Sequence, residues 1–541
     1  LTGFFARLQV SQCEPCRRQD VSSLIRMPRS YPVIDLFAGP GGLGEGFAAL
    51  FGGRGFSVPL SIEMDPVAHQ TLLLRKFFHA FDEPTSDYFD YVAGRLTREE
   101  LFARHRPEYD SAREQAWQAE LGRKDHALVT RRISEALGGT PAWALIGGPP
   151  CQAYSLAGRS RMQSRSNPAF ESDRRHFLYR EYLRIVAGHA PPVFLMENVK
   201  GLISATHGGQ KMFHRILSDL REPGRALGVP GRSHLRYRLY PLAQRAQVSL
   251  TSDDNVLPDP ETLLVRAEDY GIPQARHRVF VLGIREDLRV VPRQLERASS
   301  ITVAHAIADL PALRSMLSRE EDSEEAWRAA VSEIRQQSWF RSPLDSETAA
   351  AAGAATLALE EMTGTHRSPG KPWQQGAVHP SRLAAWYRAD CRGVSSHQAR
   401  AHMRKDLHRY FFAACFAKAN RRSPTLQSFP PELQPEHRNV ERGRRGEMFA
   451  DRFRVQLADR PSSTVTSHIS KDGHYFIHPD PTQCRSLTVR EAARLQTFPD
   501  SYYFEGPRTE QYRQVGNAVP PLLARRIAAI VHDVLSHLPG D

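Results

Sequence analysis

The stretch Tyr31-Pro-Val-Ile-Asp-Leu-Phe-Ala-Gly-Pro-Gly-Gly42 decides the fold. Its apolar first half predicts a short buried strand, and the glycines after it predict a tight turn into a helix. Glycines let the backbone come close to a ligand, and the amino end of the following helix favours polar or anionic groups. The next strand, Val58–Ile62, ends in Glu63, whose carboxylate can accept hydrogen bonds from a ribose. The pattern indicates an edge that could bind adenosine.

The glycines at 39, 41 and 44 also satisfy the GxGxxG spacing, with Glu63 about twenty residues further on. This spacing is typical of dinucleotide-binding dehydrogenases, so an oxidoreductase is a rival interpretation. A tight structural turn without a ligand is another, because such glycine motifs also occur in other contexts. The glycines alone leave these interpretations open.

A second edge residue follows the apolar run Trp143–Ile146 and the turn Gly147-Gly-Pro-Pro150. The run predicts a buried strand, and the turn places Cys151 beyond its carboxyl end, where open α/β sheets bind ligands. A cysteine there can be a nucleophile, although free cysteines are more often small packed residues. The strand Val193–Met196 delivers Glu197 to the same edge. Glu197 is therefore a candidate acid beside Cys151, or else a solvated charge at a strand end.

Two arginines precede the strand Val279–Gly283. Arg276 and Arg278 are two residues apart, which places both guanidinium groups on one side of an extended chain. They could fork onto a carbonyl oxygen or a phosphate. The alternative is a surface strand edge with charged residues that block pairing.

Two regions lack a clear strand pattern. Residues 69–142 are predicted as a mostly helical surface insertion with a solvated charged face, and Thr97–Glu100 carries a capping box. Residues 302–458 lose the alternation of strands and helices. Within them, Asp390–Arg445 mixes arginine and histidine with the aromatic residues Tyr410, Phe411 and Phe412. That mixture favours nucleic-acid recognition over mere solubility.

Order is predicted to return near the end of the chain. The alternating runs Ser463–Ile469 and His474–His478 flank Asp472-Gly473, which predicts a hairpin. Thr488–Glu491 is a second capping box that opens a helix. Gln514–Pro521 is predicted as a loop before the last amphipathic helix, Leu522–Leu535.

Composition sets outer limits on the function. Lysine and arginine outnumber aspartate and glutamate by 72 − 60 = 12, which fits a polyanionic partner or simple solubility. The six cysteines do not form a disulfide framework, and the lone Cys13-x-x-Cys16 pair lacks the other two ligands of a zinc site, so no metal is expected. No apolar run could span a bilayer, and Leu1–Ser30 has no secretory pattern. A cytoplasmic protein is expected.

Six blocks together resemble, in order, the characteristic motifs of DNA (cytosine-5)-methyltransferases of the prokaryotic modification type. A dehydrogenase has no reason to carry the later five. The resemblance implies an α/β fold with a doubly wound mixed sheet of the S-adenosylmethionine-dependent methyltransferase (Rossmann-like) type, and a smaller irregular target-recognition domain. The blocks are Asp35–Gly42, Gly148–Gln152, Glu197–Val199, Gln274–Arg278, Arg485–Glu491 and Gly516–Pro520.

The resemblance also implies a mechanism in which the thiolate of Cys151 adds to carbon 6 of a cytosine flipped out of duplex DNA. Glu197 would bind ring nitrogen 3 and the exocyclic amine. Arg278 would hold the oxygen at position 2, and Arg276 would support Glu197 and the closed active-site loop. Carbon 5 would then accept the methyl group of S-adenosylmethionine.

The resemblance also implies which residues contact the cofactor and the DNA, and that the loop 152–173 closes over the DNA. The family's third acidic contact, to the adenine amino group, has Asp82 and Asp90 as candidates. The expected cofactor contacts are Phe37, Gly39, Gly41, Glu63, Met64, Pro149 and Asn517, and the expected DNA contacts are Gln152, Ser155, Arg159 and Arg161.

The resemblance implies the following organisation: an N-terminal extension (1–30), a catalytic domain (31–301), a target-recognition domain (302–458) and a return to the catalytic domain (459–541). Double-stranded DNA is the expected partner, a cognate restriction or defence nuclease is a candidate partner, and a monomer on the DNA of the prokaryotic nucleoid is expected. A tRNA cytosine-5 methyltransferase and a catalytically silent DNA-binding protein are the alternatives. The recognised DNA sequence is not predicted.

Overall fold

A computed structural model describes most of the chain between residues 29 and 538. The predicted residues Cys151, Gln152, Ser155, Arg159 and Arg161 lie outside the described residues, as do Cys13 and Cys16. Within the described part, no helix is long and apolar enough to cross a membrane. The described residues are 29–150, 178–207, 210–229, 231–232, 234–244, 257–341, 344–361, 368–375, 383–388, 391, 393–435 and 451–538.

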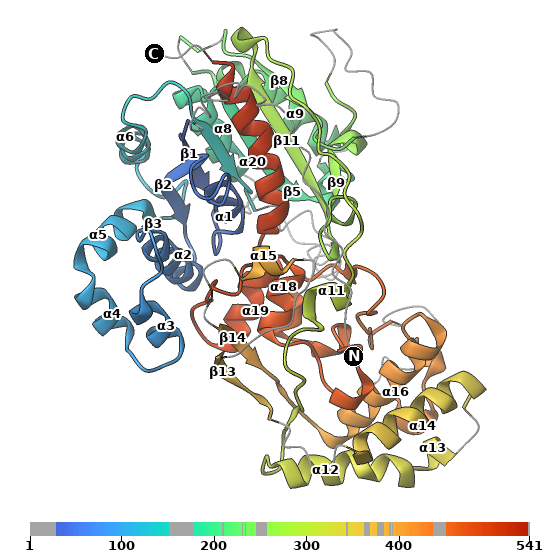
Figure 1. Ribbon diagram of the computed structural model, residues 1–541. Helices are drawn as coiled ribbons and strands as arrows, with labels where there is room; N and C mark the ends of the chain where they lie inside the picture. Colours follow the sequence, from blue (N-terminus) through green and yellow to red (C-terminus); the bar gives the residue numbers. More distant parts are fainter. Residues whose placement is uncertain are drawn as a thin grey trace, which may run out of the picture.

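A mixed sheet forms the upper part of the molecule in Figure 1. Its strand order is β3-β2-β1-β4-β5-β11-β8, with β9 also paired to β11. The first five strands in this order run parallel, and β11 runs antiparallel to β5, β8 and β9. The strands are β1 (Tyr31–Leu36), β2 (Phe56–Glu63), β3 (Ala116–Gln118), β4 (Ala144–Gly147), β5 (Val193–Val199), β8 (Tyr237–Tyr240), β9 (Leu264–Arg266) and β11 (His277–Arg285).

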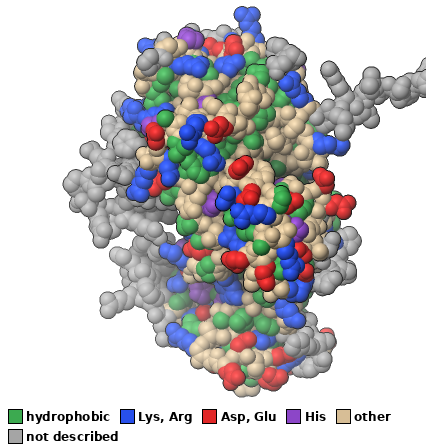
Figure 2. All heavy atoms as spheres, turned by 90° about the vertical axis from the view of Figure 1, so that its left-hand side faces the viewer, with side chains coloured by type: hydrophobic (Ala, Val, Ile, Leu, Met, Phe, Trp, Pro, Cys, Tyr) green, Lys and Arg blue, Asp and Glu red, His purple; other side chains and the backbone are tan. Residues whose placement is uncertain are grey.

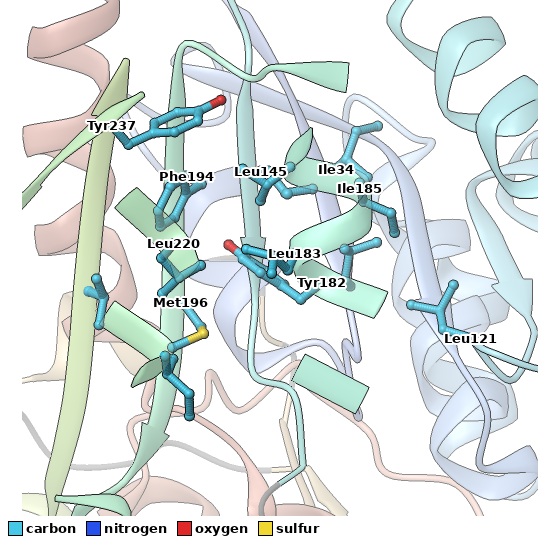
Figure 3. Close-up of a cluster of buried hydrophobic side chains, with 14 of the residues drawn as sticks. Ile34, Leu121, Leu145, Tyr182, Leu183, Ile185, Phe194, Met196, Leu220 and Tyr237 are labelled. Atoms are coloured by element: carbon cyan, nitrogen blue, oxygen red, sulfur yellow. The ribbon is translucent and has the colours of Figure 1, made fainter. Parts of the chain in front are cut away.

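Helices cover both faces of this sheet, which confirms the doubly wound fold. Helices α1 (Gly42–Ala48) and α20 (Pro521–Ser536) pack on one face through side chains such as Phe47 and Ile527. On the other face, the strand residues Leu145 and Phe194 meet Tyr182 and Leu183 of α8 (Leu178–His189) and Leu220 of α9 (Met212–Arg221) (Figure 3). Helix α6 (His126–Leu137) joins the same core through Ile133.

The region predicted as a helical insertion is helical, but part of it belongs to the sheet. Its strand β3 pairs in parallel with β2, and Gln118 lies beside Glu63. Helices α3 and α4 lie between α2 and α5, and α5 packs on α2, β2 and β3. Figure 2 shows positive and negative side chains interspersed on this side of the molecule, as in the ion pair of Arg106 with Asp110. The helices of the region are α2 (Pro66–His79), α3 (Ser86–Val92), α4 (Arg98–Arg104), α5 (Arg106–Gln115) and α6, and the predicted capping box of Thr97 and Glu100 starts α4.

The lower part of the molecule in Figure 1 is built around helix α16 (Arg404–Asn420). The aromatic residues Tyr410, Phe411 and Phe412 of the segment predicted to recognise nucleic acid are core residues that are at most 2% exposed, so they do not offer the surface contacts that this mixture suggested. They pack against the helices that surround α16. Helices α12 (Glu324–Ser332), α13 (Ser338–Arg341) and α14 (Ser346–Glu361) share the apolar core of α16. The other elements of this region are α11 (Val303–Ile307), α15 (Ala384–Tyr387), β12 (Met316–Leu317), β13 (Gly370–Gln375), β14 (Gly393–Gln398) and β15 (Ala401–His402). Helix α10 (Pro223–Leu227) lies in the upper part and packs on α8 and α9.

Helix α18 (Val489–Leu495) lies between the two parts, with all seven residues buried. It starts at the predicted capping box of Thr488 and Glu491. We call α18 and the residues 483–488 and 496–502 around it the joint. The predicted hairpin at Asp472-Gly473 is wrong, because 3-10 turns occupy Ser467–Ser470 and Gly473–Tyr475.

The predicted loop Gln514–Pro521 is wrong in its first half, because helix α19 (Arg508–Asn517) continues to Asn517. The sequence of α19 is strongly polar, which hid the helix from an analysis based on apolar periodicity. Four further short strands are β6 (Thr206–His207), β7 (Gln210–Lys211), β10 (Gln274–Ala275) and β16 (Ser462–Ser463), and β10 pairs in parallel with β16.

Candidate active site and cofactor site

Three parallel strands end side by side and bring the predicted catalytic blocks to one edge of the sheet. Leu36 of β1 pairs with Gly147 of β4, and Gly147 pairs with Met196 of β5. Strand β11 begins at this edge, because it runs antiparallel to β5 with Phe280 opposite Glu197. The edge therefore gathers the chain segments that precede Cys151 and carry Glu197 and Arg278.

Glu197 and Arg278 form an ion pair at this edge, with 3.0 Å between Oε1 and Nε. Both side chains are about four-fifths or more buried. Burial raises the pKa of Glu197, and the charge of Arg278 opposes that rise. A carboxyl group with a raised pKa binds its proton more tightly than a free carboxyl group does, which is the direction that suits a general acid. The pair can therefore donate a proton and N–H groups to one planar ring.

The turn before Cys151 packs directly on this carboxylate. A Cβ atom at Gly148 would lie 2.8 Å from Oε2 of Glu197, so a larger residue there would displace the carboxylate. Asn198 holds the other side of the turn, because its Nδ2 donates to the carbonyl of Pro149 at 3.1 Å. Sequence reasoning did not assign a role to Asn198. Its position in the Glu197-Asn-Val199 block was the signal that could have found it.

Arg276 has partners other than the predicted one. Its Nη1 donates to the carbonyl of Val465 at 2.8 Å and its Nη2 to that of Gly516 at 3.2 Å. The side chain is 1% exposed. It acts on Glu197 through charge, because it lowers the pKa of that carboxyl group without a hydrogen bond to it among the described residues. Arg276 thus ties the catalytic edge to the residue next to Asn517.

The predicted cofactor loop follows β1 in a conformation that suits its glycines. Phe37, Gly39 and Gly41 all have positive φ angles, of 55°, 59° and 96°. The space above Gly39 is open, because a Cβ atom there would meet nothing within 4 Å. Gly41 packs tightly instead, and a Cβ atom would lie 3.0 Å from both Leu72 and the hydroxyl of Tyr502.

Glu63 ends β2 beside this loop, and its carboxylate accepts backbone N–H groups from Gly39 and Asp65, each at 2.7 Å. These bonds fix the carboxylate and leave each oxygen a further lone pair for a ligand hydroxyl. The neighbouring Met64 is 53% exposed, which is unusual for a large apolar side chain. An open loop, a fixed carboxylate and an exposed apolar side chain fit the polar ribose and flat base of an adenosine.

The strand next to β2 is followed by an acid other than Asp82 and Asp90, the two candidates for the adenine amino group. Asp90 lies on α3 and pairs with Arg95, and Asp82 follows α2, so neither follows a strand of the sheet. Strand β3 ends at Gln118, and Glu120 follows two residues later. Sequence reasoning missed β3 because it has only three residues.

Asn517, another predicted cofactor residue, comes from near the end of the chain. Asn517 is the last residue of α19 and is exposed. A Cβ atom at Gly42 would lie 2.4 Å from the carbonyl of Val519, so the backbone after Asn517 packs against the start of α1. Tyr502, which sequence reasoning missed, donates its hydroxyl to the carbonyl of Pro40 and supports the loop from below.

Comparison with known proteins agrees with this arrangement. The family model for C-5 cytosine-specific DNA methylases matches residues 109–227 and 259–532. The type II methyltransferase M.Bpa9945I of Bacillus paralicheniformis is 32% identical over 93% of this chain and 99% of its own. The type II methyltransferase M.AgeI of Thalassovita gelatinovora is 26% identical, again over 93% of this chain and 99% of its own.

A solved structure supports the fold. It is described as a DNA modification methyltransferase encoded within a prophage of E. coli, and it superposes with a TM-score of 0.51 at 18% identity, covering 94% of this chain and 99% of that one. The chain belongs to the C-5 cytosine-specific DNA methylase family and is an S-adenosylmethionine-dependent methyltransferase that acts on DNA.

Proposed function

We propose that this enzyme methylates carbon 5 of a cytosine flipped out of double-stranded DNA, through a covalent adduct with Cys151. The observation that carries the proposal is the buried pair of Glu197 and Arg278 beside the turn Gly148-Pro-Pro150. Carbon 5 of cytosine is a weak nucleophile, so a group must first add to carbon 6. Cys151 follows that turn directly and is the thiol that this chain offers for the addition.

The charge balance of the addition assigns roles to the pair. When the Cys151 thiolate forms a bond to carbon 6, an electron pair moves onto the ring toward nitrogen 3. Glu197, whose pKa is raised by burial, supplies a proton to that nitrogen and accepts a hydrogen bond from the exocyclic amine. Arg278 donates to the oxygen at position 2. Ring carbon 5 then carries the electron density needed for alkylation.

S-Adenosylmethionine supplies an electrophilic methyl group on a sulfonium when bound. Four residues would hold its adenosine. The carboxylate of Glu63 is fixed by backbone bonds, the space above Gly39 is open, and the side chain of Met64 is exposed, as is Asn517. After alkylation, the proton on carbon 5 leaves to solvent water, the Cys151 sulfur leaves carbon 6 as a thiolate, and nitrogen 3 returns its proton to Glu197, which restores the aromatic ring. The target must leave the duplex first, at a cost of a few kcal/mol of unstacking.

We also propose that residues 302–458 form the target-recognition domain. Their core around α16 is separate from the cores of the sheet, so residues of that core can vary without disturbing the catalytic edge, whereas Asp309, which bonds to Arg494, must be kept in any exchange. An exchange of this segment with that of a relative should move the methylated sequence. A hybrid that keeps the original sequence preference would refute the assignment. The modification role in a restriction system, and a monomeric state on DNA, stay predictions from the resemblance.

The mechanism is tested with duplex DNA in which 5-fluorocytosine replaces cytosine. Fluorine cannot leave carbon 5 as a proton, so wild-type enzyme with S-adenosylmethionine should form an adduct that survives denaturing gel electrophoresis. Cys151→Ser should form none while still binding DNA, and Glu197→Gln should form it about 10²–10⁴ times more slowly. Lys200→Gln, on the residue after Val199, is a matched control and should trap normally.

Three outcomes would contradict the proposal. Absence of the wild-type adduct on bound DNA, or methylation by Cys151→Ser, would rule out the covalent mechanism. Methyl transfer to tRNA but not to unmethylated genomic DNA would show that the substrate is tRNA and not DNA. DNA binding without any transfer would indicate a silent binding protein.

A further inference from the structure

A pocket of about 350 Å³ lies away from the catalytic edge, where α19 begins. It is lined by Arg400, Ser470, Arg508, Thr509 and Tyr512. Two of the five residues are arginines, two carry small hydroxyl groups, and no acid is among them. The composition is that of a site for an oxyanion.

The two arginines hold their positions without carboxylate partners. Arg508 donates to the carbonyl of Ala399 at 3.2 Å and to Oε1 of Gln398 at 2.8 Å. Arg400 stacks on the ring of Tyr512 at 3.9 Å and donates to the carbonyl of Ile469. No carboxylate of a described residue lies within ion-pair distance of either guanidinium group. The Nε atom of Arg400 is buried and unbonded in this part of the chain.

Besides burial, the positive charge of the two arginines lowers the pKa of a neighbouring histidine. The pKa of the buried His402 is lowered to about 3, first by burial and then by the charge of Arg400, with a contribution from Arg508. Helix α19 adds positive potential at its start, where the N–H groups of Arg508 and Thr509 have no partner within the helix, whereas those of Glu510 and Gln511 donate to the carbonyl of Pro507. Its N-cap is Pro507, whose side chain offers no hydrogen-bond acceptor to them. An anion in the pocket could accept hydrogen bonds from the two guanidinium groups and from the first two N–H groups of α19.

Two short segments connect the pocket to the catalytic edge. Helix α19 runs from Arg508 to Asn517, a length of about 14 Å at 1.5 Å per residue. The turn Ser467–Ser470 runs from Val465, which Arg276 holds, to the pocket wall at Ser470. Thr466, His468 and Lys471 along this turn are exposed. The surface between the pocket and the catalytic edge is thus polar, accessible and without a bulky cover among these residues.

We propose that this pocket binds one backbone phosphate of the DNA substrate, on the flank of the flipped cytosine. The inference rests on the proposed function, which places the cytosine at the edge near Asn517. Arg508 and Arg400 face the phosphate oxygens, and the hydroxyl of Thr509 and the helix N–H groups complete the contacts. The pocket positions the duplex and reads no base, as phosphate contacts do in general.

The test compares Arg508→Gln with wild type in DNA binding, measured by fluorescence anisotropy on a random duplex from 50 to 300 mM salt. One lost phosphate contact should reduce the slope of log Kd against log salt by about 0.9. Thr509→Ala should weaken binding at every salt concentration with the slope unchanged, because no charge is removed. Arg225→Gln, at an arginine that is 78% exposed on α10, removes the same charge elsewhere and should leave the slope unchanged. Binding of S-adenosylmethionine should be equal in all four proteins and reports that each is folded.

Three other results would contradict either the phosphate site or the proposed function. An unchanged slope in Arg508→Gln, with normal cofactor binding, would overturn the pocket while leaving the proposed function intact. If inorganic phosphate raises the Tm of wild type but not of Arg508→Gln, and the DNA slope is unchanged, the pocket binds a free anion and not the DNA backbone. Failure of wild type itself to bind or methylate DNA would remove the proposed function and the pocket's assignment together.

Discussion

Strand β4 and helix α18 are both completely buried, but opposite kinds of side chain surround them. Leu145 of β4 lies between Ile34 and Phe194 on the neighbouring strands, within an apolar cluster. Helix α18 carries Arg490 and Arg494, each 0% exposed. The core around β4 excludes charge, whereas the joint is made from it.

The joint compensates each buried charge with several specific bonds. Arg494 donates to both oxygens of Asp500, at 2.9 and 2.6 Å, and to Asp309 at 2.5 Å. Arg485 makes two bonds of 2.7 Å to Glu491. Because Asp309 follows α11, these bonds join the part of the chain around α16 to the end of the catalytic domain. Apolar packing tolerates many arrangements, while such networks require one.

The largest expected effect comes from breaking this network at its centre. Arg494→Met leaves Asp500 and Asp309 buried without their shared partner, and we expect a loss of about 3–5 kcal/mol in the free energy of unfolding. Urea unfolding followed by circular dichroism measures it. Arg131→Met removes an arginine that is 68% exposed and paired with Glu135, so it should change stability by less than about 0.5 kcal/mol. A loss below about 1 kcal/mol in Arg494→Met would show that the joint is not held by charge.

The same contrast explains which parts of the fold could be predicted. Strands β1, β4, β5 and β11 were predicted because apolar runs ending in breakers describe a sheet that excludes charge. Helix α16 was misread because it is buried on all sides. Its His408 bonds to the carbonyl of Ala330 and its Arg409 to that of Leu433, so residues that look like a basic surface are interior. Local sequence does not report such distant partners.

The site divides in the same way. Glu197 and Arg278 were predicted together, because consecutive strand ends place them at one edge, and the ion pair is present. The partners of Arg276 were not predicted, since Val465 and Gly516 lie about 190 and 240 residues further along the chain. The predicted hairpin failed for the same reason, because the N–H of Val465 bonds to Gln274 and not to a neighbouring strand.

An intermediate effect is expected in the sheet. Leu145→Ala leaves a cavity between Ile34 and Phe194 and should cost about 3 kcal/mol. Leu145→Met keeps the volume and should cost less than about 1.5 kcal/mol. The measurement is again urea unfolding. Equal costs for the two substitutions would mean that packing volume does not hold this core, and the contrast with the joint would fail.

The smallest expected effect is at Asp35, a buried acid within the apolar part of the sheet. Asp35 of β1 is 1% exposed, and neither carboxylate oxygen has a hydrogen-bond partner among the described residues. Burial raises its pKa, and the charge of Lys76 opposes the rise. The folded state therefore keeps a proton that the unfolded chain has already lost. Its stability falls as the pH rises from the unfolded pKa, near 3.8, toward the raised folded value.

Asp35→Asn removes this titration at nearly constant shape. Relative to wild type, the variant should gain about 2–3 kcal/mol in the free energy of unfolding between pH 5 and pH 8, because only wild type must ionise a buried carboxyl group whose pKa is raised to about 7. Asp533→Asn, at a side chain that is 48% exposed, should show no such trend. A difference between wild type and Asp35→Asn that is the same at both pH values would mean that Asp35 is ionised throughout. Lys76 would then compensate it fully, and the sheet would contain a buried ion pair of the kind that builds the joint.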